Sequence, residues 1–385
     1  MTLPAFDFHQ HGGITGDALR SFLVHCARNS VSDIFLQGGG PLVVDLHGRK
    51  VRASEFRIEP PQLARLIDEV FSEQIKGDLK SGKGVDRALQ LTGDLYNRYG
   101  LGRGDRLRFR CNFVQATIGD YDMVPALTLR TIPTVIPQLE SFGLEEDLFP
   151  ALLPHKGIGL VVGETGSGKS TLLAAIYQYC AQQYPDRKIV TAEDPIEFLL
   201  NFPHAILMPE QSQIGRDVAS FGEHLRLTLR RAPGVIGVGE IRDLETLDGA
   251  VMNGQSGHLC LSTMHTDSPG ETIPRALMLV PTEQREAMAH NLLSNLQYVI
   301  AQRLLRTTDG KRQAVREYLV FDDDIRAELG RREHTHWREW IDNHLSERKA
   351  RMSDKAWDLH QQGRIDQHEL LSVITQRELD RRTSR

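Results

Sequence analysis

The chain has 385 residues, of which 40% are hydrophobic and 25% are charged, and its formal net charge is −5 at pH 7. This length accommodates two or three domains with separate cores, and the composition is that of a folded globular protein. The acidic balance gives no general attraction to nucleic acid or to an anionic membrane. No apolar run approaches the roughly 20 residues that span a bilayer, so we expect no transmembrane segment.

The cysteines and the first residues indicate the cellular compartment. Cys26, Cys111, Cys180 and Cys260 are scattered, with no CxxC pair and no metal-site spacing. Residues 1–10 lack the basic and apolar regions of a signal peptide. We therefore expect reduced, buried cysteines and a cytoplasmic protein.

The first third of the chain predicts a separate α/β domain. Apolar residues recur with helical spacing in residues 15–28 and 60–71. Strand-like segments accompany these helices at residues 32–37, 42–46, 50–53, 107–116 and 126–130. The proline-containing segment 131–137 predicts an extended linker. We place the first domain at residues 1–133 and the linker at residues 134–142.

A glycine-rich motif, GETGSGKS, follows the apolar run 158–162 and precedes the helix-forming residues 171–176. This order of strand, glycine loop and helix is the context that a Walker A motif requires. Glycines let backbone N–H groups turn toward a polyphosphate at the positive end of a helix dipole. Lys169 would add a charge near the β- and γ-phosphates, and the Ser170 hydroxyl would ligate Mg²⁺. The alternative, a chance glycine-rich turn, is disfavoured because every position of the motif is filled. The predicted ATP-binding residues are Gly163, Glu164, Thr165, Gly166, Ser167, Gly168, Lys169, Ser170 and Thr171.

Acidic residues follow two further apolar, strand-like runs. Glu193 and Glu197 come after the first run, and Glu240 comes after the second. Carboxylates just beyond the ends of parallel strands lie in the ligand crevice beside the phosphate loop. An acid of the first group can orient or deprotonate the attacking water, and Glu240, at the Walker B position, can hold Mg²⁺. The alternative is that the first group caps a turn, which its Asp-Pro pair favours.

Two histidines flank a third strand-like run, with His258 at its start and His265 just past its end. Their separation does not make a simple zinc pair. A histidine at a sheet end is often structural, but beside a nucleotide crevice His265 can sense the γ-phosphate.

The last part of the chain, from about residue 330, is charged and prone to form helices. Trp337, Ile341 and Leu345 share one helical face. We expect this face to pack onto the preceding domain, and the alternative is a docking surface for a neighbouring subunit or a partner.

The ordered motifs GETGSGKST, EDPIEF, VGEIRDLET and GHLCLSTMHT resemble the Walker A, Asp box, Walker B and His box of the ATPases of bacterial secretion and type IV pili. The similarity covers most of residues 30–306. It implies an α/β chain with an N-terminal PAS-like domain, a RecA-like P-loop ATPase domain at residues 143–310 and a mostly helical extension at residues 311–385. It also implies hexameric rings that convert ATP hydrolysis into movement of envelope machinery.

The resemblance assigns roles residue by residue. Lys169 and Ser170 correspond to the residues that hold phosphate and Mg²⁺, and Glu197 corresponds to the general base. Glu240 is at the Walker B acid, and the two His-box residues are His258 and His265. Arginines that the N-terminal domain offers to the nucleotide match Arg108, Arg110 and Arg130. Because Arg110 lies on an alternating strand, a position facing solvent remains an open alternative.

Departures from the family pattern indicate which subfamily of these ATPases the chain resembles. The absence of a CxxC pair differs from the ATPases of type II secretion, which usually carry a tetracysteine module. Residues 315–322 and 352–358 resemble the tail of the Dot/Icm type IVB secretion ATPases and of their relatives in I-type conjugative transfer. The chain is also similar to the pilus retraction ATPases.

The resemblance implies further copies of the chain and secretion or conjugation proteins at the inner membrane as partners, with the chain peripheral to that membrane. Two alternatives stay open: a RecA-like nucleic-acid translocase and a nucleotide switch that does not hydrolyse ATP.

Overall fold

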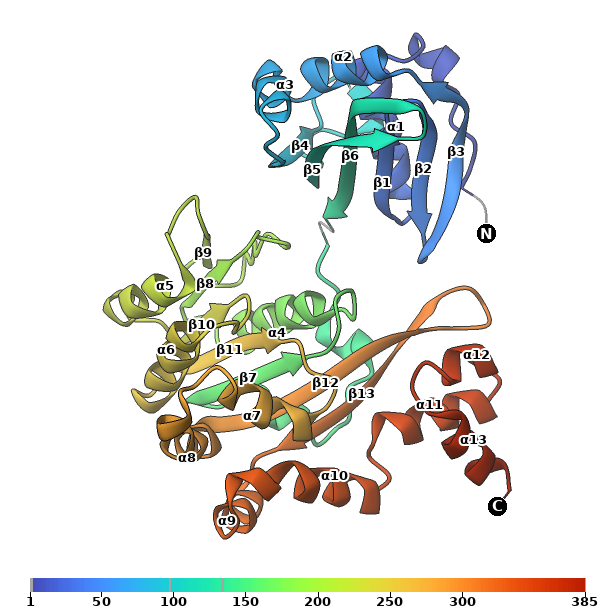
Figure 1. The fold of residues 1–385 in the computed structure, drawn as a ribbon. Helices are drawn as coiled ribbons and strands as arrows, with labels where there is room; N and C mark the ends of the chain where they lie inside the picture. The colour runs from blue at the N-terminus through green and yellow to red at the C-terminus, as the bar shows by residue number, and fades with distance from the viewer. Residues whose placement is uncertain (1–2, 97, 133–134, 385) are drawn as a thin grey trace. The chain divides into compact units, whose positions relative to one another are not determined.

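The computed structural model describes residues 3–96, 98–132 and 135–384. The chain divides into two compact units, Met1–Val135 and Ile136–Arg385 (Figure 1). The predicted end of the first domain at residue 133 and the predicted start of the linker at residue 134 lie outside the described residues. The division into functional domains stays a prediction.

Unit 1 is built on an antiparallel six-stranded sheet with the order β3-β2-β1-β6-β5-β4. Alternation along β5 explains its two faces, because Phe109 and Phe113 are buried whereas Arg110 is exposed. Helices α1 and α2 share the core with the buried face. The elements are α1 (Gly16–Arg28), β1 (Val31–Gln37), β2 (Gly40–Leu46), β3 (Arg49–Ile58), α2 (Pro60–Val70), α3 (Glu73–Lys80), β4 (Val85–Thr92), β5 (Arg106–Ile118) and β6 (Tyr121–Ile132).

Unit 2 is built on a seven-stranded sheet with the order β13-β12-β7-β11-β10-β8-β9. Its neighbouring strands run parallel except for β13, which pairs antiparallel with β12. Every residue of β7 is buried, as expected for a central strand that helices cover on both faces. The strands are β7 (Gly157–Val162), β8 (Ile189–Glu193), β9 (Glu210–Gln213), β10 (Val235–Val238), β11 (Leu259–Met264), β12 (Leu296–Arg306) and β13 (Arg312–Val320).

Helices pack against both faces of this sheet (Figure 1). Val161 of β7 packs in one core cluster with residues of α4, and Leu160 packs in another with residues of α6, α7 and α8. The helices are α4 (Lys169–Gln183), α5 (Phe221–Thr228), α6 (Leu244–Gln255), α7 (Pro269–Leu277) and α8 (Arg285–Asn295). The carboxyl ends of the parallel strands therefore meet at one edge of the sheet, where a ligand crevice is expected.

The C-terminal region contributes both a strand and helices. The sequence-based boundary at residue 311 precedes β13, yet β13 is part of the main sheet. Trp337, Ile341 and Leu345 are buried in the same core cluster as residues of α7 and α8, so this face packs rather than lying exposed. The remaining helices are α9 (Asp323–Gly330), α10 (Trp337–Glu347), α11 (Met352–Gln361), α12 (Gln367–Leu370) and α13 (Gln376–Thr383).

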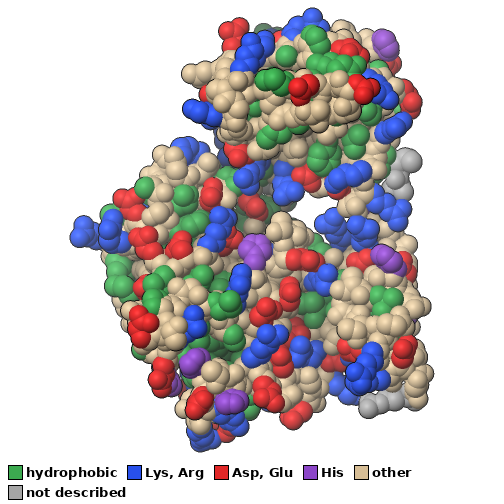
Figure 2. Space-filling view, in the orientation of Figure 1, with side chains coloured by type: hydrophobic (Ala, Val, Ile, Leu, Met, Phe, Trp, Pro, Cys, Tyr) green, Lys and Arg blue, Asp and Glu red, His purple; other side chains and the backbone are tan. Residues whose placement is uncertain are grey.

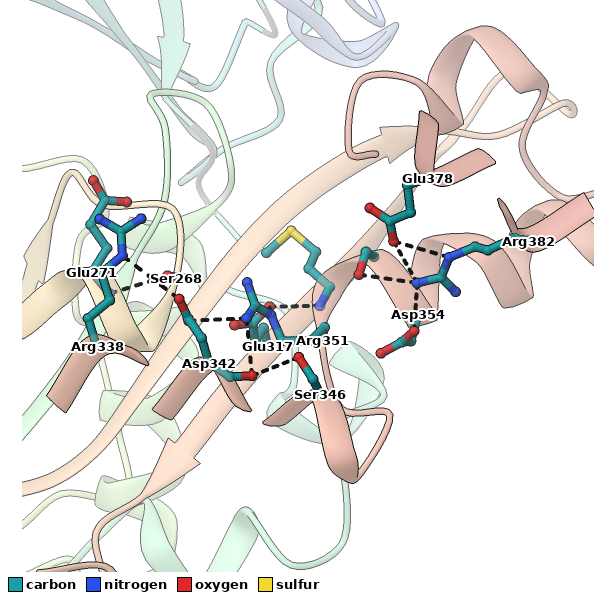
Figure 3. Close-up of polar contacts among 12 residues, drawn as sticks. Ser268, Glu271, Glu317, Arg338, Asp342, Ser346, Arg351, Asp354, Glu378 and Arg382 are labelled. Atoms are coloured by element: carbon teal, nitrogen blue, oxygen red, sulfur yellow. Dashed lines mark hydrogen bonds and ion pairs between the residues drawn. The ribbon is translucent and has the colours of Figure 1, made fainter. Parts of the chain in front are cut away.

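Ion pairs fasten these helices to the sheet. The Arg351 guanidinium, just before α11, lies 3.1 Å from the buried Glu317 carboxylate of β13 and 3.1 Å from the Asp342 carboxylate of α10 (Figure 3). Glu317 also accepts a hydrogen bond from the Met352 backbone N–H at 2.8 Å. Burial raises the pKa of Glu317, and the Met352 N–H and Arg351 oppose this rise.

Two predictions from composition can be compared with the structure. All four cysteines are free and buried, and burial raises the pKa of each thiol. They are therefore protonated and unreactive at neutral pH. None of the helices in the described part of the chain combines the length and apolar content that crossing a bilayer requires.

Candidate active site

The glycine-rich segment forms a loop that joins β7 to α4, the predicted strand–loop–helix order. Gly163 and Gly168 have φ values of 144° and 86°, a region that residues with a side chain rarely adopt. This backbone places the loop at the N-terminus of α4, where N–H groups and the helix dipole favour an anion. Glu164, Thr165 and Gly166 are exposed on the loop, Ser167 is buried, and Ser170 and Thr171 are half-buried in the first turn of α4.

Lys169 closes the loop onto itself. Its Nζ donates hydrogen bonds to the carbonyl oxygens of Gly163, at 2.7 Å, and Glu164, at 2.8 Å. Burial lowers the pKa of Lys169, whereas the negative charges of Glu197 and Glu164 raise it. An ammonium group has three N–H donors, so a donor remains for a phosphate oxygen while the loop keeps its shape.

The neighbouring strand β12 contacts the loop through Gln302. Gln302 is buried, and its Nε2 donates a hydrogen bond to the Ser167 carbonyl at 2.6 Å. A Cβ at Gly163 would lie 2.3 Å from the Gln302 carbonyl oxygen, so no side chain fits there. The Ser167 hydroxyl is buried without a hydrogen-bond partner among the described residues. A buried hydroxyl of this kind is suited to a ligand that reaches the loop.

Glu193 organises the turn that carries Glu197. Its Oε1 accepts hydrogen bonds from the Thr191 hydroxyl and the Gln211 side-chain amide, both at 2.9 Å. Its Oε2 accepts a longer one, 3.4 Å, from the Glu197 backbone N–H. Burial raises the pKa of Glu193, and these hydrogen bonds oppose the rise. The structure thus gives Glu193 the turn-holding role, whereas the Glu197 side chain is exposed and acts electrostatically on Lys169.

Glu240 and His265 meet at the ends of β10 and β11. The His265 Nε2 lies 3.1 Å from Glu240 Oε2, and Arg242 contacts the other carboxylate oxygen. Burial lowers the pKa of His265, and the positive charges of Lys169 and Arg242 lower it further. The ring is therefore neutral at pH 7, and its Nε2–H can donate to the Glu240 carboxylate.

Hydrogen bonds between neighbouring strands hold these strand ends together. The Gly239 N–H donates to the Ala192 carbonyl at 2.8 Å, and the Thr263 hydroxyl donates to the Gly239 carbonyl at 2.7 Å. The ends of β8, β10 and β11 are thereby fixed beside one another. Lys169, Glu197, Glu240 and His265 are brought to one edge of the sheet, as their positions after strands predicted.

His258 lies at the opposite end of β11 from His265. It directly precedes β11, whereas His265 directly follows that strand. A six-residue strand is about 20 Å long, and His258 hydrogen-bonds to the nearby Ser256 hydroxyl through Nδ1 at 3.2 Å. Within one chain the structure therefore does not bring His258 to the phosphate loop, which corrects its predicted place among the nucleotide-binding residues. The strand predicted between the two histidines is present, and its length sets their separation.

The predicted arginines of unit 1 share one sheet face. Arg110 of β5 is directly opposite Arg130 of β6, and Arg108 is half-buried two residues earlier. Arg130 Nε donates to Asp33 Oδ1 at 2.8 Å, and Arg110 Nε lies 3.9 Å from Asp86 Oδ1. The Arg110 side chain is 45% exposed. In unit 1 taken by itself, Arg110 therefore faces solvent, as the alternative expected.

The donor set suits the metal that the motifs imply. The Ser170 hydroxyl and the Glu240 carboxylate are hard oxygen donors, which Mg²⁺ prefers, and Mg²⁺ in phosphate sites needs only one or two protein ligands. No cluster of three or more His, Cys, Asp or Glu side chains among the described residues forms a separate metal cage. These residues fit a metal that is held jointly with a phosphate.

Sequence reasoning missed the residues beneath the loop. Gln302 and Arg303 lie on β12, and Arg303 Nε is 3.0 Å from Glu164 Oε1. The available signal was a polar pair inside an otherwise apolar run, at residues 298–305. Such a pair on a buried strand calls for a partner, but the sequence does not say which loop supplies it.

Comparison with known proteins agrees with this geometry. A family model described as "Type II/IV secretion system protein" matches residues 103–381. The type IV pilus ATPase PilU of Pseudomonas aeruginosa is 32% identical over 343 residues, which cover 89% of this chain and 84% of PilU.

Two solved structures are similar over nearly their whole length. The ATPase DotB of Legionella pneumophila has a TM-score of 0.84 and 31% identity, covering 96% of this chain and 97% of that one. The pilus retraction motor PilT, solved with bound ADP, has a TM-score of 0.75 and 30% identity, covering 94% and 99%. These likenesses confirm the predicted α/β fold class, with an N-terminal domain and a C-terminal ATPase domain. The chain belongs to the Type II/IV secretion system protein family.

Proposed function

We propose that this protein is a Mg²⁺-dependent ATPase that works as a homohexamer and drives type IVB secretion or conjugative transfer machinery. The observation that carries the proposal is the gathering of Lys169, Glu197, Glu240 and His265 around the phosphate loop. Relatives named as ATPases support it, and so does the ADP bound to PilT.

Hydrolysis requires a water aligned with the γ-phosphorus and a group that accepts its proton. Glu197 is exposed at the site, and its negative charge raises the pKa of Lys169. In the proposed step the water oxygen bonds to the γ-phosphorus while the bond to the β–γ bridging oxygen breaks. The water proton passes to the Glu197 carboxylate, and ADP and phosphate leave.

The other residues hold and neutralise the phosphates. Lys169 and the loop N–H groups bind the β- and γ-phosphates, while His265 orients the Glu240 carboxylate. Ser170 and Glu240 are the residues that would hold Mg²⁺, which supplies charge neutralisation at the phosphates when bound. Each role matches a contact or a position at the carboxyl edge of the sheet.

The proposal extends to the arginines of unit 1. Arg108, Arg110 and Arg130 lie on one face of the sheet, and the resemblance to secretion ATPases gives them contact with nucleotide. A guanidinium on the phosphates stabilises the charge that develops during hydrolysis. If so, Arg110→Ala and Arg130→Ala lower turnover in the full chain, and unchanged turnover in both removes these residues from the mechanism.

The proposed partners are further copies of the chain and proteins of the secretion or conjugation machinery, which hold it peripherally at the cytoplasmic side of the inner membrane. The net charge of −5 does not favour the nucleic-acid translocase. On the face that Figure 2 shows, basic and acidic side chains intermingle over both units.

The decisive assay measures phosphate release by the full chain against protein concentration, with Mg²⁺ or with excess chelator, and sizes the nucleotide-bound species. We expect Mg²⁺-dependent turnover that rises per subunit as a hexamer forms. Turnover that DNA stimulates would favour the translocase, and nucleotide binding without phosphate release would favour the switch.

A further inference from the structure

Arg303 of β12 contacts the phosphate loop and the C-terminal helices at the same time. Its Nε lies 3.0 Å from Glu164 Oε1 in the loop. Its Nη1 donates a hydrogen bond of 2.6 Å to the Ser372 carbonyl, which follows α12. The Arg303 side chain is half-buried, at 32% exposure, whereas its partners Glu164 and Ser372 are exposed.

A cleft separates the two parts that Arg303 connects. It has a volume of about 360 Å³, and its walls include Glu164 of the loop, Arg351 and Met352 at the start of α11, and Val373 beyond α12. Arg303 lines this cleft and contacts both walls. The Arg303 guanidinium thus bridges the phosphate loop and the C-terminal helices across this cleft.

The C-terminal helices have their own attachment to β12 and β13. Leu305 of β12 and Val315 of β13 form a small core with Ala356, Ile365, Leu370, Ile374 and Leu379 of the helical region. The Arg306 backbone N–H donates to the Glu369 carboxylate at 2.9 Å. Met352 packs against both this small core and a main core, but the buried residues of the small core belong to no other cluster. Its helices can therefore loosen without unfolding unit 2.

The same strand supports the phosphate loop one residue earlier, where Gln302 donates to the Ser167 carbonyl at 2.6 Å. Consecutive residues of one strand therefore contact the loop and the helices. Because a strand inside a paired ladder is stiff, a shift at one contact is transmitted to the other.

We propose that Arg303 is a positioning residue that couples the docking of helices α11–α13 to the conformation of the phosphate loop, so that nucleotide affinity depends on how these helices sit. The inference rests on the proposed nucleotide binding at that loop. A protein or subunit that moves the C-terminal helices would thereby change nucleotide affinity, and nucleotide would reciprocally change the docking of the helices.

The test uses the full chain and four variants: Arg303→Met, Arg303→Lys, Leu370→Ala and the double variant of Arg303→Met with Leu370→Ala. Leu370→Ala removes apolar contact from the small core and loosens the helices. Affinity for a fluorescent ADP analogue and hydrogen exchange of peptides covering residues 163–170 and 367–375 are measured for each. The matched control is Arg312→Met, an exposed arginine of β13.

We expect Arg303→Met to weaken affinity about fivefold or more, to raise exchange in both peptides, and to leave kcat at saturating nucleotide within about twofold. Arg303→Lys keeps a charge but not the planar fork, so it restores part of the affinity. Introduced into the wild type, Leu370→Ala should weaken nucleotide affinity. Introduced into the Arg303→Met variant, it should cause no further loss.

Equal effects of Leu370→Ala in both backgrounds would overturn the coupling, as would unchanged affinity in Arg303→Met. If the wild type binds no nucleotide, the proposed function fails instead. The exchange of residues 163–170 in response to Leu370→Ala then still decides the coupling.

Discussion

The Nε2 atom of His265 and the Oε2 atom of Glu240 lie 3.1 Å apart across the ends of two adjacent parallel strands. Burial together with Lys169 and Arg242 lowers the pKa of His265, so the ring is neutral at pH 7 and donates to the carboxylate. This contact fixes the orientation of the acid that follows β10. The chemistry proposed for the site depends on that orientation.

His265→Ala leaves Glu240 without this donor while the phosphate loop stays intact. We expect kcat to fall about tenfold or more and nucleotide affinity to change by less than about threefold. Steady-state kinetics and nucleotide titration separate the two quantities. His258→Ala is the matched control, because His258 is at the opposite end of β11, and an equal loss of kcat in the control would argue against the assignment.

Gly163→Ala places a Cβ 2.3 Å from the Gln302 carbonyl oxygen, at a φ of 144°. Strain of this kind costs about 1–3 kcal/mol, which the loop relieves by leaving the conformation that binds phosphate. Nucleotide affinity should fall about tenfold or more, as measured by titration. Gly330→Ala is the control, because its Cβ would have no described atom within 4 Å apart from its chain neighbours and the backbone of its own helix. Normal affinity in Gly163→Ala would show that the loop adapts.

The buried His224 side chain should make the folded protein less stable at acidic pH. It is fully buried on α5, neither ring nitrogen has a hydrogen-bond partner among the described residues, and burial lowers its pKa to about 4, with a smaller effect from Arg231. The unfolded chain binds the proton near pH 6.5 and the folded chain does not. The stabilisation is therefore complete above pH 6.5 and lost as pH falls toward 4, by about 3 kcal/mol.

The measurement is hydrogen exchange of α5 in the full chain between pH 7.5 and 4.5, corrected for intrinsic rates. His224→Phe removes the titrating group and should flatten the pH dependence of local stability. A variant with the same pH dependence as the wild type would assign the acid sensitivity to other groups.

Gln302→Ala should destabilise unit 2. The Gln302 Oε1 accepts a hydrogen bond of 2.7 Å from the buried Arg316 Nε, and burial lowers the pKa of Arg316 to about 10. Removing the Gln302 acceptor leaves the buried, charged Arg316 guanidinium without this hydrogen bond. The free energy of unfolding should fall by about 2–3 kcal/mol. Thermal unfolding measures the loss. Gln313→Ala removes a contact with the exposed Arg364 and should cost less than about 1 kcal/mol, so comparable losses would contradict this account.

The sequence predicts most of the site because its parts follow a local rule. A strand, a glycine loop and a helix form one continuous motif, and acids placed directly after apolar strands must reach the same sheet edge. Glu197, Glu240 and His265 could be proposed on that basis.

What the sequence does not predict depends on contacts between distant segments. Gln302 lies 135 residues from Ser167, and Arg303 lies 69 residues from Ser372, so no local pattern indicates either pairing. The placement of β13 in the main sheet likewise depends on its pairing with β12 rather than on its own composition.

The most direct test compares ATP binding and phosphate release in the wild type, Lys169→Ala and Glu197→Gln, each as the full chain with Mg²⁺. We expect the wild type to bind and hydrolyse ATP and Lys169→Ala to lose tight binding. Glu197→Gln should bind ATP normally but hydrolyse it about 10²–10⁴ times more slowly. Normal hydrolysis by Glu197→Gln would exclude Glu197 as the base, and normal binding and turnover by Lys169→Ala would contradict ATP hydrolysis at this loop.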